Sequence, residues 1–144
     1  MNSIKMRRRR LIPGLFCSLL LAVGCNGPGE TLHPVKGKLT VNDKPVPMGN
    51  VTFYPDKAKG NESLHLPVGV IEADGSFELV VPGGRKGAPA GWYKVVVYAV
   101  DNPQPMKPNV YFVHQDYADL EKTSLKVEVI AEPAAGRYDW KLKR

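Results

Sequence analysis

The sequence predicts an all-β domain, a β-sandwich, preceded by a short N-terminal segment of a different kind. Several short segments alternate apolar and polar residues with a period of two. Most of the 14 Gly and 13 Pro fall between these segments, and no stretch after residue 24 has a sustained helical period. Period-two segments separated by turn residues are typical of half-buried strands, and about seven of them without helices favour a sandwich.

The first 24 residues are predicted to be a signal peptide. Lys5 and Arg7–Arg10 place five cations and no acid in the first ten residues. The next fourteen residues, Leu11 to Gly24, carry no charge. This run is shorter than the roughly 20 apolar residues of a membrane-spanning helix, whereas a basic start, an apolar run and a small-residue exit are typical of an export signal.

The end of this segment, Leu21-Ala22-Val23-Gly24-Cys25, resembles the bacterial lipobox. The resemblance implies that cleavage follows Gly24 and that a diacylglyceryl group is attached to the sulfur of Cys25. Ala22 is a departure, because the lipobox most often has Leu there. Two alternatives stay open: cleavage after Gly24 by an ordinary signal peptidase, and an uncleaved anchor.

The chain after the signal has the size of one domain, 120 residues from Cys25 to Arg144. The formal charge of +6 comes mostly from the signal, since 15 basic residues remain against 14 acids. A balance of about +1 does not predict a nucleic-acid partner, for which a basic patch is expected. The only cysteines are Cys17 and Cys25, so the domain has no disulfide of its own.

Seven segments of this domain are predicted to be strands. Their apolar residues alternate, although the buried face of the third segment is not settled by the pattern; the segments are residues 35–42, 50–54, 66–73, 76–81, 92–100, 124–130 and 137–143. Asn42-Asp43 and Asp74-Gly75 are hairpin turn pairs. Residues 26–34 form a Gly/Pro spacer. Residues 82–90 are expected to be a mobile loop, and residues 101–123 a second long loop with one or two helical turns near its end.

These strands and turns resemble a carboxypeptidase regulatory-like, transthyretin-like domain. The matching pieces cover residues 34–142; they are VKGKLTVNDKPVPMGNVTFYP, GVIEADGSFEL, PAGWYKVVV, TSLKVEV and YDWKL. The resemblance implies a seven-stranded Greek-key sandwich that carries no catalytic set. Asp43 departs from the pattern, because such domains usually have Gly after the first strand.

No motif in the chain predicts catalysis, a metal or a cofactor. His33, His65 and His114 lie far apart and have no zinc-ligand spacing. The acids Asp116, Asp119 and Glu121 match no calcium loop, and residues 83–87 lack the spacing of a phosphate-binding loop. A G-x-S-x-G nucleophile motif is absent from the sequence.

Trp92 and Tyr98 are the candidate binding surface. Both lie on the face of their strand opposite Tyr93, together with Val96. Aromatic residues on a partly exposed sheet face often mark interfaces. Packing beneath a covering segment is the alternative.

The sequence therefore predicts three parts: a signal peptide (1–24), a lipidated tether (25–34) and a β-sandwich (35–144). We expect a non-catalytic, lipid-anchored protein of the cell envelope that acts as a binding or structural module toward an envelope protein or a glycan. The alternative is a carrier or sensor of a small ligand or carbohydrate. Asn26 is not the aspartate that favours inner-membrane retention in well-known sorting systems, which favours the outer membrane.

Overall fold

The computed structural model describes residues 29–101 and 104–144 of the chain. The predicted signal peptide and the predicted cleavage and lipid sites, Gly24 and Cys25, lie outside these residues. The described part consists of strands and turns, with two 3₁₀ turns at Lys57–Lys59 and Gln115–Ala118. It contains no helix that is long and apolar enough to cross a membrane. The predicted all-β class is confirmed.

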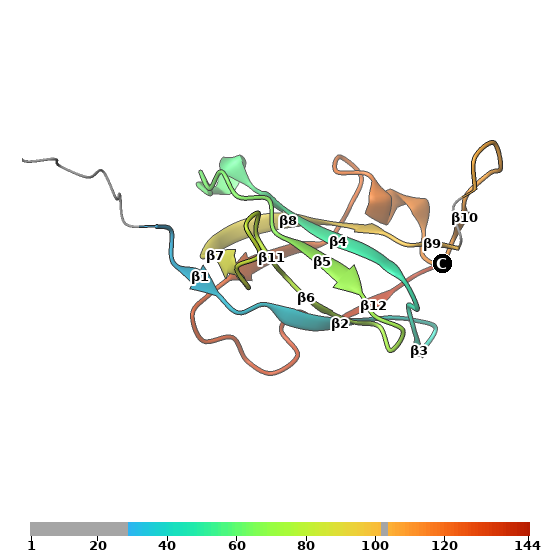
Figure 1. The fold of residues 1–144 in the computed structure, drawn as a ribbon, viewed down its shortest axis with the longest axis horizontal. Helices are drawn as coiled ribbons and strands as arrows, with labels where there is room; N and C mark the ends of the chain where they lie inside the picture. Colours follow the sequence, from blue (N-terminus) through green and yellow to red (C-terminus); the bar gives the residue numbers. More distant parts are fainter. Residues whose placement is uncertain (1–28, 102–103) are drawn as a thin grey trace, which may run out of the picture.

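Two sheets enclose the core, and Figure 1 shows β2 running below the strands of the larger sheet. The larger sheet is antiparallel and has the strand order β11 (Lys126–Val129), β8 (Gly91–Tyr98), β4 (Gly49–Pro55) and β5 (Val68–Ile71). The second sheet is built around β2 (Lys36–Val41), which pairs in parallel with β12 (Trp140–Leu142) and antiparallel with β3 (Lys44–Pro45) and β6 (Ser76–Glu78).

Two further pairs of short strands lie at opposite ends of the domain (Figure 1). β1 (Leu32–His33) pairs with β7 (Ala88–Pro89), and β9 (Val100–Asp101) pairs with β10 (Val110–Tyr111). The spacer expected over residues 26–34 therefore includes a strand that is docked on the domain.

The expectation of a mobile loop over residues 82–90 is corrected by the structure. Val80 and Lys86 form a β-bridge, and the Gly87 amide donates a hydrogen bond to the Leu79 carbonyl at 2.7 Å. Ala88 and Pro89 are buried. Only the tip of this segment is an exposed turn. Its second half pairs with β1 and is also bonded to residues 79–80.

Each of the seven predicted segments contains a strand. The last one is shorter than predicted, since two consecutive turns, closed by Arg137 and Asp139 amides, occupy its first half. In the third segment Ile71 is buried and Val70 is 62% exposed, which settles its inward face. In the first hairpin, Asn42 and Asp43 both have positive φ, 50° and 60°. Two-residue hairpins favour this geometry, and Asn and Asp tolerate it.

The core lies between the inner faces of the two sheets and is centred on aromatic rings. Phe53 of β4 lies 5.6 Å from Tyr93 of β8 and 6.1 Å from Trp140 of β12, measured between ring centroids. Trp140 also stacks on Phe77 of β6 at 6.1 Å. Such pairs contribute about 0.5–1.5 kcal/mol beyond the burial of their area. The Phe53–Trp140 contact therefore joins the larger sheet to the second sheet.

Gly37→Ala tests how closely β2 packs on the segment before β12. A Cβ at Gly37 would clash with the carbonyl oxygen of Tyr138 and lie 2.7 Å from Cζ of Phe77. We expect the free energy of unfolding to fall by about 1–3 kcal/mol, the usual cost of overpacking, measured by urea denaturation. Gly29→Ala is the control, because nothing lies within 4 Å of its Cβ position. Equal midpoints for the two variants would contradict the close packing.

Candidate functional site

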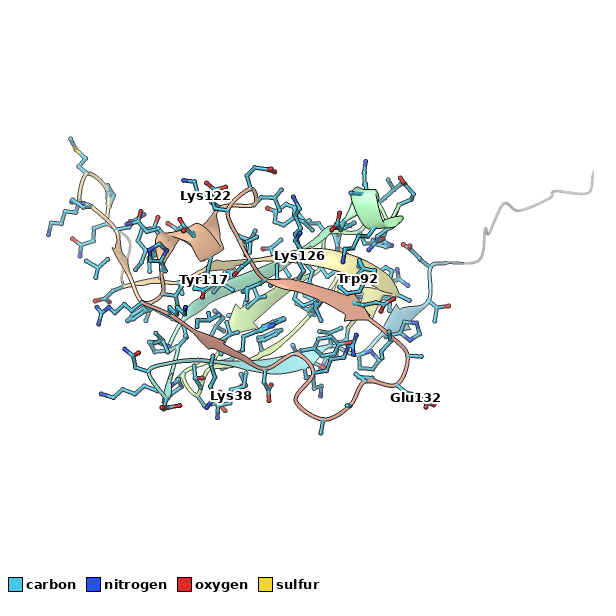
Figure 2. The ribbon with its side chains drawn as sticks, turned by 180° about the vertical axis from the view of Figure 1, so that it is seen from behind. Lys38, Trp92, Tyr117, Lys122, Lys126 and Glu132 are labelled. Carbon is cyan, nitrogen blue, oxygen red and sulfur yellow. The ribbon has the colours of Figure 1, made fainter. Side chains whose placement is uncertain are left out.

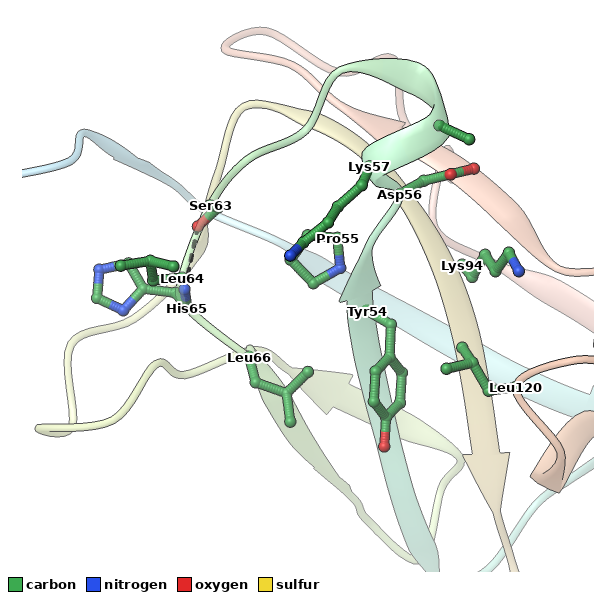
Figure 3. Close-up of a pocket in the computed structure, with 11 residues that line it drawn as sticks. Tyr54, Pro55, Asp56, Lys57, Ser63, Leu64, His65, Leu66, Lys94 and Leu120 are labelled. Atoms are coloured by element: carbon green, nitrogen blue, oxygen red, sulfur yellow. Dashed lines mark hydrogen bonds between the residues drawn. The ribbon is translucent and has the colours of Figure 1, made fainter.

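A half-open groove of about 430 Å³ lies on the outer face of the larger sheet, at the end of β4 (Figure 3). Most of its lining is apolar and comes from segments far apart in the sequence, including Tyr54, Leu64, Leu66 and Leu120. The polar residues of its lining are Asp56, Lys57, Ser63, His65 and Lys94. Lys94 is paired with Glu121 at 4.0 Å. The groove therefore offers an apolar surface bordered by two lysines, a histidine and one acid.

The 3₁₀ turn that forms one wall of the groove begins where β4 ends. The Asp56 amide donates a hydrogen bond to the Trp92 carbonyl at 2.9 Å. The Asp56 carbonyl accepts hydrogen bonds from the amides of Lys59 and Asn61. Gly60 ends the turn with φ 81°, a conformation that glycine adopts without steric cost. The chain then returns along the groove toward β5.

Asn61 holds this returning segment against β8. Its side chain is buried; Nδ2 donates to the Trp92 carbonyl at 2.9 Å and Oδ1 accepts from the Ser63 amide at 3.1 Å. Gly91 allows the close approach, because a Cβ there would lie 2.9 Å from Nδ2 of Asn61. Asn61 also begins an N-glycosylation sequon in the sequence, but its buried amide is engaged in the folded domain.

The N-terminal segment meets the rim of the groove. The Ser63 hydroxyl donates to Oε2 of Glu30 at 3.0 Å and accepts from the His65 amide at 3.1 Å, the dashed line in Figure 3. Nε2 of His65 lies 3.6 Å from the same Glu30 oxygen. Glu30 therefore attaches the start of the described chain directly to the segment that lines the groove.

The two predicted surface aromatics lie near opposite ends of β8 and are not brought together. Trp92 is half-buried, and Nζ of Lys59 lies 3.5 Å from its ring centroid, a cation–π contact. Tyr98 is 39% exposed and meets Tyr111 edge-on at 6.1 Å. The Gln115–Ala118 turn packs on β8, and Val96, between the two aromatics, is buried. Figure 2 shows Trp92 and Tyr117, a residue of this turn, well apart on the domain.

The histidines and loop acids do not assemble into a cluster. Among the described residues, no group of three or more His, Cys, Asp or Glu side chains has a geometry that could hold a metal ion. Nδ1 of His114 pairs with Asp116 at 3.4 Å, and Asp119 pairs with Lys122 at 3.4 Å.

Hydrogen bonds hold three carboxylates in their ionised form, of which Asp74 is exposed and Glu78 and Asp119 are half-buried. The pKa of Asp74 is lowered mainly by the Ser76 hydroxyl, and the pKa of Glu78 by Lys86 and then Lys36. The pKa of Asp119 is lowered by the Glu121 amide. Burial raises the pKa of Tyr93, whose hydroxyl donates to the Pro89 carbonyl at 2.9 Å. All four shifts favour the form that these groups already hold at neutral pH.

The groove was not predicted from the sequence. Its one local signal is Leu64 and Leu66 in an otherwise polar connection, where apolar residues have no strand partner to cover. Comparison with known proteins finds no matching family model, no similar curated protein and no similar solved structure. The function is therefore argued from the residues and their geometry.

Asn61→Ala tests the attachment of the groove wall. The substitution leaves the part-buried Ser63 amide without its partner and removes one of the two hydrogen bonds that the Trp92 carbonyl accepts, which costs about 1–3 kcal/mol. We expect lower stability to urea and faster amide hydrogen exchange at Ser63. Glu62→Ala is the matched control, since its side chain is exposed. Unchanged exchange at Ser63 in the Asn61 variant would show that another contact holds this segment.

Proposed function

We propose that the protein is a non-catalytic binding module of the bacterial cell envelope, attached to a membrane by a lipid on Cys25. The groove on the larger sheet is its binding site. The observation that carries this proposal is the position of the groove: its rim residues Ser63 and His65 contact Glu30, close to the proposed lipid site. A binding site beside the anchor suits a partner that is itself in or near the membrane.

The finer architecture proposed is a seven-stranded Greek-key sandwich of the carboxypeptidase regulatory-like, transthyretin-like kind. Its support is that strands from all seven predicted segments are distributed over two sheets with one core between them. The sequence pieces that resemble this family fall on those strands and on the hairpin turns. The resemblance implies accessory rather than catalytic roles, and a shared fold alone never assigns chemistry.

The resolved pKa shifts point to no general acid or base among the described carboxyl groups. A general acid or base works best with a pKa near the working pH, which for a carboxyl group requires an upward shift. The shifted carboxyl groups of the described residues all move downward. The titratable residues of the groove lining are Asp56, two lysines and one histidine, and that histidine is paired with Glu30.

The occupant we propose for the groove is an apolar segment of an envelope protein that also carries an acidic group. Leu66, Leu120 and Tyr54 supply the apolar contact, and Lys57 supplies a complementary charge, whereas Lys94 is shared with Glu121 and Asp56 is the acid of the lining. A glycan at Trp92 is less well supported, because the Lys59 ammonium already covers that ring.

The size of the groove favours a second candidate function, in which the protein binds and carries a small amphiphilic ligand. Sites for small molecules usually measure about 300–1,000 Å³ and are mostly apolar with a few polar groups. The groove, at about 430 Å³, lies within this range. An acyl chain or a similar apolar body with an acidic head would match its lining.

Cys25→Ser tests the anchor. In a bacterial host fed with labelled palmitate, we expect the wild-type chain to carry label and to sediment with membranes, and the variant to lose both. A density gradient then separates outer from inner membranes, and we expect the wild type with the outer membrane. An unlabelled wild type that is soluble outside the cytoplasm would contradict the lipid and leave a secreted module.

A photoreactive amino acid at Leu120 tests the occupant. We expect cross-links from this position to an envelope protein, and several-fold fewer from Val110, a control that is 56% exposed on β10. Native mass spectrometry of the purified chain separates the two candidates, because a carried small ligand adds a discrete mass. Equal cross-linking at both positions, without a bound mass, would contradict the groove as the binding site.

A further inference from the structure

The distance between the proposed lipid and the domain is short. Four residues separate Cys25 from Glu30 in the sequence. An extended chain spans at most about 3.6 Å per residue, so Glu30 lies within about 18 Å of Cys25. Glu30 is held by Ser63 and His65, and β1 follows immediately and pairs with β7. One end of the domain is therefore kept close to whatever surface holds the lipid.

The side chains at this end suit a bilayer surface. Leu64, next to both Glu30 partners, is 96% exposed. Lys57 and Lys59 are exposed on the neighbouring 3₁₀ turn. We call this set, Glu30, Lys57, Lys59 and Leu64, the tether end. The exposed leucine and the two lysines, of which Lys59 lies over the Trp92 ring, offer the apolar and cationic contacts that suit the boundary of an anionic bilayer.

The opposite end of the domain lies far from the tether end. Figure 1 shows the β9–β10 pair at the other side of the molecule from β1 and the 3₁₀ turn after β4. The exposed loop before β10 carries Met106, which is as exposed as Leu64. The molecule therefore provides an internal comparison, with one bare apolar side chain at each end.

We propose that the tether end faces the bilayer that holds the lipid on Cys25. Leu64 enters the headgroup region, while Lys57 and Lys59 contact anionic headgroups. This inference rests on the proposed lipid anchor and adds an orientation to it: the groove opens beside the membrane, and the β9–β10 end points away.

Because the proposed lipid already holds the chain at the membrane, a weak contact of the tether end with the bilayer is sufficient to orient the domain. A single leucine and two lysines, opposed by Glu30 and the nearby Glu62, would bind a vesicle weakly by themselves. A short tether raises the local concentration of the two surfaces, so the second contact forms without strong affinity of its own. The contact sets the orientation of the domain rather than its attachment.

The test uses the full lipidated chain, reconstituted in vesicles of phosphatidylethanolamine and phosphatidylglycerol. Leu64→Cys and Met106→Cys are each labelled with an environment-sensitive fluorophore. The label is specific, because Cys17 leaves with the signal and the sulfur of Cys25 carries the lipid. Both positions are fully exposed, so neither substitution disturbs the core.

We expect the label at position 64 to shift to the blue and to be quenched several-fold more by doxyl lipids than the label at position 106. Adding Lys57→Glu and Lys59→Glu should reduce this difference in anionic vesicles and leave it unchanged in phosphatidylcholine vesicles. Equal quenching at both positions in vesicle-bound protein would overturn the orientation and leave the anchor intact. Protein that does not float with the vesicles would overturn the anchor and the orientation together.

Discussion

The packing of Phe53 against Trp140 joins the two sheets, and the rest of the domain depends on this junction. The only cysteines of the chain precede the described residues, so no disulfide supports the core. Trp140 is placed by the parallel pairing of β12 with β2, which brings the end of the chain beside its first long strand. Because Trp140 also stacks on Phe77, the same ring links three strands from distant parts of the sequence.

β8 connects this core to the groove. Its inward side chains, Tyr93, Val95 and Val97, are fully buried between the sheets. Its backbone holds the groove wall, since the Trp92 carbonyl accepts hydrogen bonds from the Asp56 amide and the Asn61 side chain. The groove wall is thus hydrogen-bonded to a strand that the core holds in place, which favours a site that is formed before a partner arrives.

The tether is part of the same arrangement. Because β1 pairs with β7 and Glu30 contacts the groove segment, the chain enters the domain at a fixed place and not through a loose spacer. The proposed membrane contact lies at the same end as the groove, so the proposed anchoring and binding would take place side by side. The proposed partner would therefore meet the groove close to the bilayer, where both proteins diffuse in the plane of the membrane and the search for each other is confined to that plane.

The sequence by itself determined the strands, the hairpin turns and the proposed export signal, because each depends on neighbouring residues. Period-two alternation sets which side chains face inward. Asn42 and Asp43 favour a two-residue turn because both residue types tolerate the positive φ that they adopt there. Only the tertiary structure decided the groove, since Tyr54 of β4, Leu64 of the connection to β5 and Leu120 of a later turn line it together and no local pattern links them. It also covered the strand face that Trp92 and Tyr98 share, because the 3₁₀ turn after His114 packs on β8 and Val96 is buried between the two aromatics. Contacts between distant segments are set by the whole core, and for that reason the fold class was predictable while the site was not.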